Sequence, residues 1–226
     1  VSKKVWIIFW VWCVLLFGGH MYVSGRGKVD DNKVDTNKIQ LTIPKTGNIT
    51  EHVLYKKHLK IILVEYGDFQ CPGCGGAYPN LKTISEKYKD KIAFVFRNFP
   101  LPSIHPNARA AAAAAEAAGL QGKYWEMHDA LYTNQQIWQS SDTTERTTLF
   151  ASYAKEIGID NATFEKNLAN VSINEKISFD QALGKKINIS GTPTLLLSGE
   201  KLSDEVTNDL IRSSGAKLDA LIKAKL

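Results

Sequence analysis

The chain has 226 residues, a formal net charge of +5 at pH 7, and a composition with 44% hydrophobic and 23% charged residues. This length and composition are typical of one sizeable globular domain with appendages. Basic residues do not form a stripe with interleaved aromatic residues, so nucleic acid is not an expected partner.

An apolar segment opens the chain. The uncharged run at residues 5–17 follows Lys3 and Lys4, and a weakly apolar continuation extends it. The run has the length of a signal peptide, and with its continuation it is long enough for a single membrane span. Residues 23–25 make a poor cleavage site, which favours a retained transmembrane anchor at residues 1–23 over a cleaved signal.

Under either interpretation, anchor or signal peptide, the rest of the chain is exported from the cytoplasm. The stretch 24–46 is polar and rich in Asp, Asn, Gly and Lys, so it is predicted as a flexible tether. We therefore predict a single-pass cell-membrane protein whose globular part, residues 47–226, lies on the extracytoplasmic side. The alternative is a secreted or periplasmic protein after signal cleavage.

The central motif joins a strand to a pair of cysteines. The stretch opens with a continuous apolar and β-branched run at residues 61–64, which predicts a strand buried on both faces. A Gly-Asp turn then leads into Cys-x-x-Cys, and apolar positions recur at helical spacing over residues 78–88. The predicted order is strand, turn, dithiol and helix, with Cys71 at the helix start and Cys74 one turn inside.

This placement has chemical consequences for the two sulfurs. At a helix N-terminus, unpaired backbone N–H groups and the positive end of the dipole favour the thiolate, so Cys71 is the better nucleophile and leaving group. Pro72 suits the first turn, where its missing N–H would have had no partner. Cys74 lies on the same side of the helix and can attack a mixed disulfide formed on Cys71.

The motif alone leaves two other interpretations open, half of a zinc site and a structural disulfide. A closed zinc site needs four ligands, and the chain has no second cysteine pair and no closely spaced pair among its five histidines. We expect His105 at a helix start and His128 to be partly buried and hydrogen-bonded, and we predict neither a metal nor another cofactor. Outside the anchor only Cys71 and Cys74 remain, which indicates chemistry and not scaffolding.

The remaining elements indicate an α/β fold. A second buried run at residues 92–97 predicts a parallel right-handed crossover from the first strand. A helical tract at about 104–187 follows and is interpreted as an insertion, in which alanines 110–115 allow close helix approach. The last predicted sheet strands begin with residues 194–197. Pro193 precedes them, at a position where a cis peptide bond is frequent although trans is the commoner form.

Several separated motifs carry a family resemblance. Cys-Pro-Gly-Cys after a strand, with Gly-Thr-Pro-Thr at 191–194, resembles the thioredoxin superfamily. More specifically, four motifs resemble the DsbA-like thiol:disulfide oxidoreductases: Gly-Asp-Phe-Gln-Cys-Pro at 67–72, Phe-Arg-Asn-Phe-Pro-Leu at 96–101, His-Pro-Asn-Ala-Arg-Ala at 105–110, and Gly-Lys-Tyr-Trp-Glu-Met-His at 122–128. The resemblance covers most of residues 47–226.

The resemblance implies a thioredoxin fold with an inserted helical domain. It implies that Cys71 is the exposed nucleophile and Cys74 the buried resolving thiol. It also implies that Pro193 is a cis-proline which, together with Thr192, faces the disulfide and presents backbone to an extended substrate.

Two further positions concern the chemistry of the site. Glu65 matches the buried acidic position beneath the dithiol in this superfamily. A carboxyl group in a low dielectric has a raised pKa and can relay the proton of the resolving thiol, and the alternative is a salt-bridged strand residue. Gly73 stands where the best-known oxidases of this kind have His. Without that donor, the pKa of Cys71 should be higher and the disulfide less oxidising.

The sequence thus predicts an enzyme that donates the Cys71–Cys74 disulfide to exported proteins with free thiols through a mixed disulfide. The family implies reoxidation by a membrane quinone-linked partner. The alternatives are a reductase or isomerase with the same site, a peptide-binding holdase in which the cis-proline groove matters more than the thiols, and a zinc-binding module.

Overall fold

The structure is a computed structural model that describes residues 35, 38–40 and 48–226. The predicted anchor at residues 1–23 and most of the predicted tether at 24–46 lie outside the described residues, so both stay predictions. Within the described ranges, no helix is both long enough and apolar enough to cross a membrane.

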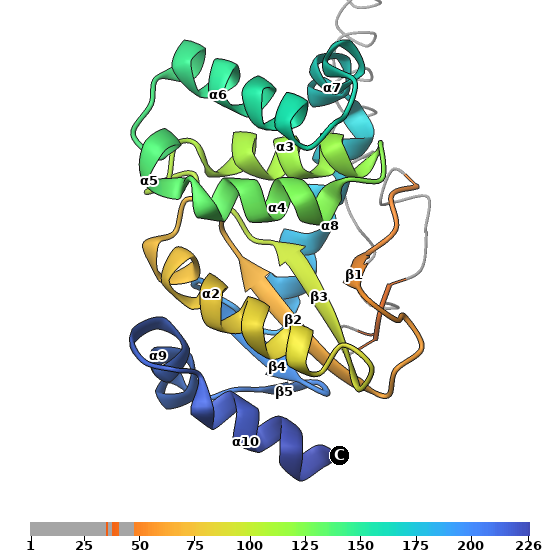
Figure 1. The fold of residues 1–226 in the computed structure, drawn as a ribbon, viewed down its shortest axis with the longest axis vertical. Coiled ribbons are helices and arrows are strands. Elements are labelled where there is room, and N and C mark those ends of the chain that lie inside the picture. The colour runs from red at the N-terminus through yellow and green to blue at the C-terminus, as the bar shows by residue number, and fades with distance from the viewer. Residues whose placement is uncertain (1–34, 36–37, 41–47) are drawn as a thin grey trace, which may run out of the picture. The chain divides into compact units, whose positions relative to one another are not determined.

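A five-stranded sheet with the order β1-β3-β2-β4-β5 organises the domain (Figure 1). Its strands are β1 (His52–Leu54), β2 (Ile61–Gly67), β3 (Ile92–Asn98), β4 (Thr194–Leu197) and β5 (Glu200–Lys201). Strand β2 pairs in parallel with β3 and antiparallel with β4, while β1 and β5 are antiparallel edge strands. The parallel pair, connected through helix α2 (Pro72–Lys87), confirms that the two strands are joined by a parallel crossover.

Helices cover both faces of the sheet. On one face, α2, α9 (Asp204–Arg212) and α10 (Ala216–Lys225) pack on apolar side chains of β2, β3 and β4, among them Leu63, Phe94 and Leu197. On the other face, α8 (Val171–Lys186) packs against β3, and Figure 1 shows it behind the strands. Because β2 and β3 are buried on both faces, their sequences are mostly apolar and do not alternate between apolar and polar residues.

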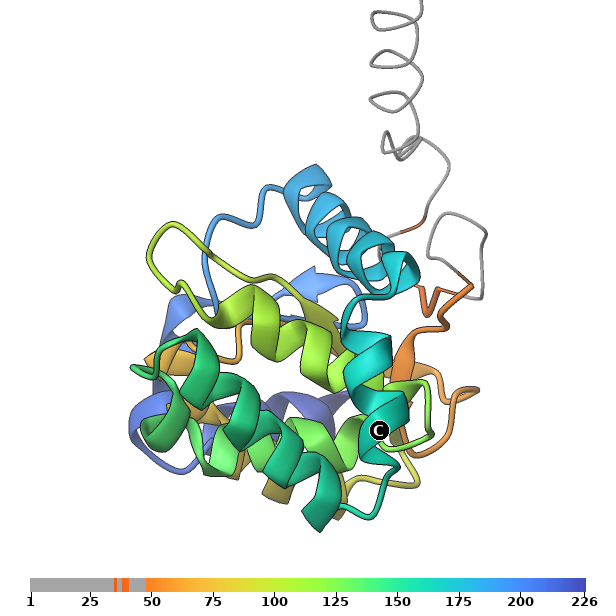
Figure 2. The same ribbon diagram turned by 90° about the horizontal axis from the view of Figure 1, so that it is seen from above.

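The chain between β3 and β4 forms a helical insertion. It contains α3 (Ala108–Gly119), α4 (Tyr124–Thr133), α5 (Gln135–Trp138), α6 (Thr143–Glu156), α7 (Asn161–Leu168) and then α8, all within the predicted range of about 104–187. Helices α3, α4 and α6 pack against one another (Figures 1 and 2). The predicted insertion is therefore confirmed.

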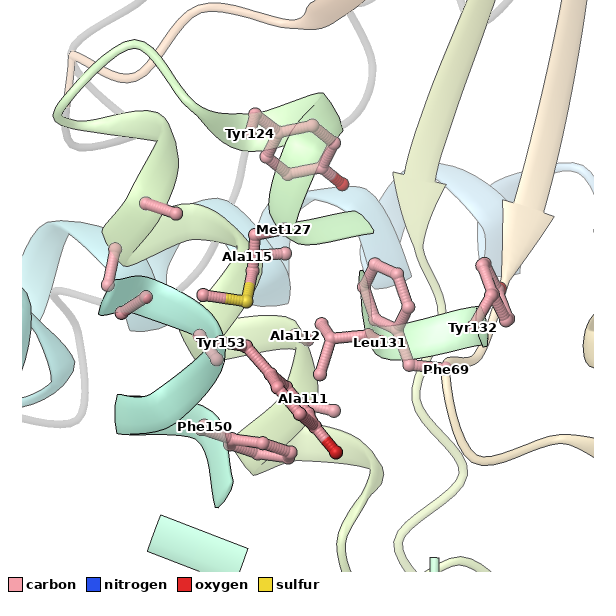
Figure 3. Close-up of a cluster of buried hydrophobic side chains, with 14 of the residues drawn as sticks. Phe69, Ala111, Ala112, Ala115, Tyr124, Met127, Leu131, Tyr132, Phe150 and Tyr153 are labelled. Atoms are coloured by element: carbon pink, nitrogen blue, oxygen red, sulfur yellow. The ribbon is translucent and has the colours of Figure 1, made fainter. Parts of the chain in front are cut away.

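Small side chains on α3 make the close packing of the insertion possible. Figure 3 shows Ala111, Ala112 and Ala115 of α3 among larger side chains of the neighbouring helices, including Met127 of α4 and Phe150 of α6. All five are at most 2% exposed. Because alanine leaves room for a neighbour, the α3 backbone comes close to α4 and α6. The interior of the insertion continues through Phe69 to the turn that carries the dithiol.

Candidate active site

Asp68 shapes the turn between β2 and α2. Its carbonyl oxygen accepts a hydrogen bond from the Cys71 N–H at 3.0 Å, and its carboxylate accepts from the backbone N–H groups of Gln70 at 2.8 Å and Leu101 at 2.9 Å. The same carboxylate bonds Nδ1 of His105 at 2.8 Å. His105 was predicted at a helix start; it lies three residues before α3 and ties the loop after β3 to this turn.

The two cysteines occupy the positions predicted for them. Cys71 is the N-cap of α2 and Pro72 its first residue, so Cys74 lies one turn inside the helix. Both are free thiols. Cys71 retains 8% exposure and Cys74 none, and the backbone N–H of Asp68 donates to the Cys74 sulfur at 3.5 Å. Cys71 is thus more buried than the exposed nucleophile that the resemblance implies, but of the two cysteines it alone keeps some exposed surface.

The loop before β4 lies against Cys71. The Thr192–Pro193 peptide bond is cis, as the resemblance implies, and the Cys71 thiol donates to the Thr192 carbonyl oxygen at 3.2 Å. A Cβ added at Gly73 would lie 3.2 Å from Cδ of Pro193 and 3.6 Å from the Cys71 sulfur and from Cδ1 of Ile211. The missing side chain of Gly73 thus lets the proline ring approach the dithiol closely.

The surroundings of Cys71 favour its thiolate. Its pKa falls from the ordinary 9.0 to about 5. A hydrogen bond from the Cys74 thiol is the largest cause, and burial opposes it. The Thr192 side chain and the backbone N–H groups of Cys74 and Gly73 lower the pKa further. The helix terminus therefore contributes as predicted, but the main stabiliser is Cys74.

Cys74 has the opposite tendency. Burial and the hydrogen bond to Cys71 raise its pKa well above 9.0, and the negative charge of Glu65 adds to the effect. One sulfur is thus a stable thiolate and a good leaving group, while the other holds its proton. A pair of sulfurs with these properties can exchange disulfides in two separate steps.

Glu65 lies on β2 and is 2% exposed. Burial raises the pKa of its carboxyl group from 4.5 to about 8, and the charge of Cys71 adds to the rise. No cation among the described residues contributes to this pKa, which argues against a salt-bridged strand residue. At neutral pH Glu65 therefore carries a proton that it can exchange with Cys74.

Gln135 is a further residue of this site, and it was not among the predicted site residues. Gln135 belongs to α5 and is 3% exposed, and its Nε2 donates to the carbonyl oxygens of Phe69 at 2.7 Å and Cys71 at 2.9 Å. A side chain at Gly75 would overlap the Gln135 amide, so glycine makes room for this contact. Gln135 fixes the entry to α2 from the helical insertion, and no local pattern in the sequence signals it.

Replacing Gln135 with alanine should loosen this entry. Two buried carbonyl groups lose their side-chain donor, so we expect the free energy of unfolding to fall by about 1–3 kcal/mol in urea denaturation. The exposed neighbour Gln136 is the matched control, and Gln136→Ala should change stability by less than about 0.5 kcal/mol. Equal stabilities of the two variants would show that the Gln135 contacts contribute nothing.

Known proteins share this fold. The structure resembles BdbD from Bacillus subtilis with a TM-score of 0.64 and 23% identity, covering 83% of this chain and 96% of that one. It resembles α-DsbA1 from Wolbachia pipientis with a TM-score of 0.65 and 21% identity, covering 84% and 95%. The fold is that of the DsbA-like thiol:disulfide oxidoreductases, and the dithiol lies at the start of α2.

A family model described as thioredoxin matches residues 48–214, and the chain belongs to this family. It is also 36% identical over 151 residues to a protein named Na(+)/H(+) antiporter NhaA 1 from Salinispora arenicola. That match covers 67% of this chain and 22% of the antiporter. The chain spans about a quarter of the length of the curated relatives it matches, so the transport activity in their name is not carried over to it.

Proposed function

We propose that this protein is a membrane-tethered, extracytoplasmic thiol:disulfide oxidoreductase that donates its Cys71–Cys74 disulfide to exported proteins with free thiols. The observation that carries the proposal is the geometry of the site: Cys71 is the N-cap of α2, and the loop with the cis Thr192–Pro193 bond lies against it, with the Thr192 carbonyl oxygen 3.2 Å from the Cys71 sulfur. In this setting the pKa of Cys71 is lowered to about 5 and that of Cys74 is raised. A stable Cys71 thiolate stabilises the reduced form, and a disulfide whose reduced form is stabilised is an oxidant.

The proposed reaction has two steps. A substrate thiolate attacks the Cys71 sulfur of the disulfide, the Cys71–Cys74 bond breaks, and Cys74 leaves as a thiolate that takes the proton of Glu65. A second substrate thiolate then attacks the substrate sulfur of the mixed disulfide. The substrate disulfide forms, and Cys71 leaves as the thiolate that its surroundings stabilise.

The substrate has then lost two electrons and the enzyme has gained them. The family resemblance implies that a membrane quinone-linked partner takes these electrons and restores the disulfide.

The same site could run the exchange in the other direction, as a reductase or isomerase. The reduction potential of the full chain in detergent, equilibrated with glutathione, separates these possibilities. A disulfide donor should lie between about −120 mV, as in DsbA, and about −180 mV, as in protein disulfide isomerase. A value near the about −270 mV of thioredoxin would overturn donation and favour a reductase.

Gly73 sets how oxidising the pair is. In Gly73→His, the imidazole can donate to the Cys71 thiolate, so we expect a lower Cys71 pKa and a potential less negative by about 30 mV for each 1.4 kcal/mol gained. Gly73→Ala is the matched control, because its Cβ meets the same 3.2 Å contact with Pro193 but brings no donor. An unchanged or more negative potential in Gly73→His would contradict this explanation.

The extracytoplasmic location rests on the predicted anchor at residues 1–23. In intact cells treated with a permeant reductant, a membrane-impermeant maleimide should label Cys71, the thiol with the lowered pKa and residual exposure. Cys71→Ala controls for other thiols. Labelling that appears only after lysis would overturn the proposed location.

A further inference from the structure

A cavity of about 170 Å³ lies between α2, α4 and the strands β1 to β3. Its lining includes two buried ionisable side chains, Glu65 from β2 and His128 from α4. It also includes Lys82, Glu86 and Asp129, which are exposed or half-buried. The cavity therefore connects the carboxyl group beneath the dithiol to the protein surface, and its volume is sufficient for several water molecules.

His128 has an unsatisfied nitrogen in the wall of this cavity. Its Nδ1 bonds the Asp129 carboxylate at 3.1 Å, so in the neutral ring Nδ1 carries the hydrogen and Nε2 is an acceptor. Nε2 is buried and has no partner among the described residues. We expected His128 to be partly buried with its hydrogen-bonding groups satisfied. It is instead 3% exposed, and although Nδ1 is bonded, Nε2 is not.

Aromatic rings prevent the imidazole from turning to another partner. The rings of Phe96, Trp125 and Tyr132 have centroids 4.9, 5.0 and 5.0 Å from that of His128. Buried polar atoms of native proteins are paired with protein groups or ordered water. With its ring held in the cavity wall, Nε2 is placed to accept a hydrogen bond from a cavity water.

Several titratable groups surround this ring. They are Asp129, Tyr124 and Tyr132 on α4, Lys82 and Tyr78 on α2, His52 on β1, and Glu65 on β2, which lines the same cavity. Burial, the largest influence, lowers the pKa of His128, so the ring is neutral at pH 7 and Nε2 is free to accept.

We propose that a water held by Nε2 of His128 links Glu65 to solvent and carries the proton that Glu65 exchanges with Cys74. When the disulfide is reduced, Cys74 leaves as a thiolate and takes the proton of Glu65. The Glu65 carboxylate then takes a proton from the cavity water, which is replenished from solvent at the Lys82 and Asp129 end. When the disulfide forms, the proton moves the other way. His128 is a positioning residue in this scheme, which rests on the proposed function.

The test is the pH dependence of exchange between the full chain and a dithiol peptide, followed in stopped flow. His128→Phe keeps an aromatic ring and removes the acceptor, while His128→Gln restores a side-chain acceptor. We expect His128→Phe to slow proton-coupled exchange about tenfold below pH 8, His128→Gln to recover most of the rate, and the Cys71 pKa to stay at about 5 in both. The exposed His58 supplies the control, His58→Phe.

Superimposable pH profiles of His128→Phe and wild type would overturn the inference. A second measurement needs no variant. In wild type, the ¹⁵N resonance of His128 Nε2 should shift with a midpoint near 8, as Glu65 ionises, and should differ between dithiol and disulfide. If the ¹⁵N resonance did not change between pH 6 and pH 9 in either redox state, the inference would also be overturned. Failure of the proposed function is distinguishable, because it would appear in the reduction potential of wild type itself, which does not depend on His128.

Discussion

Replacing Cys74 with alanine should stop turnover and leave substrate covalently attached to Cys71. Cys71 is the accessible sulfur and keeps its position at the start of α2, so it still attacks a substrate disulfide. Without Cys74, no other cysteine among the described residues is present to displace the substrate. We expect multiple-turnover exchange to fall by at least about 10³-fold, with the adduct visible by non-reducing electrophoresis and mass spectrometry.

The same variant tests what stabilises the thiolate. The hydrogen bond from Cys74 is the largest cause of the lowered Cys71 pKa, so its removal should move that pKa from about 5 upward toward 9.0. At pH 6 a smaller fraction of Cys71 is then thiolate. The adduct should therefore form more slowly than it would if the Cys71 pKa were still about 5. Thiolate absorbance near 240 nm measures this titration.

Cys71→Ala is the matched control, because among the described residues it leaves only the buried thiol whose pKa is raised. It should form no adduct and show no titration near pH 5. It also separates the enzyme from a holdase, since a protein that only held peptides would keep its activity without Cys71. Sustained turnover by Cys74→Ala, or a Cys71 pKa still at about 5, would contradict the scheme.

The parts of this site that the sequence predicted are those set by local spacing. A strand that ends at Gly67 and a helix that begins at Pro72 place Cys71 and Cys74 at one helix terminus, whatever the rest of the chain does. The buried strands were equally predictable, because their continuous apolar runs follow from helices on both faces of the sheet. The cis bond before Pro193 required the family resemblance, since spacing alone leaves trans the commoner form.

The parts that the sequence did not predict depend on tertiary contacts. Gln135 reaches the Cys71 carbonyl across 64 residues, and neither residue shows this locally. His128 was expected to be hydrogen-bonded, and its neighbour Asp129 does satisfy Nδ1. The rings and the carboxyl group that isolate Nε2 come from β2, β3 and α2 as well as from α4, so only the folded arrangement shows an acceptor without a partner.

Replacing Glu65 with glutamine should make the protein more stable and less active. The carboxyl pKa is about 8 in the folded protein and 4.5 ordinarily, so below pH 4.5 both states hold the proton and the carboxyl group has no effect. Between these values the unfolded chain releases the proton and the folded one keeps it. The folded state therefore loses about 1.4 kcal/mol per pH unit relative to the unfolded state, and about 5 kcal/mol in total above pH 8.

Glutamine does not ionise, so the stability of Glu65→Gln relative to wild type should rise by about 4 kcal/mol from pH 5 to pH 8 in urea denaturation of the reduced protein. The cost of burying an amide is the same at every pH. The prediction is therefore tested by how the difference in free energy of unfolding between Glu65→Gln and wild type changes with pH. Glu165→Gln, at an exposed position on α7, is the matched control and should follow wild type.

The loss of activity has a separate cause. Glutamine cannot exchange a proton with Cys74, so formation and release of the Cys74 thiolate should slow by about 10²-fold, while the attack of substrate on Cys71 is little affected. Parallel stability curves for wild type and Glu65→Gln from pH 5 to pH 8 would show that Glu65 does not hold a proton in the folded protein. Glu65 would then be ionised in the folded protein at neutral pH, and it could influence the pKa of Cys74 by its charge but could not donate a proton to it.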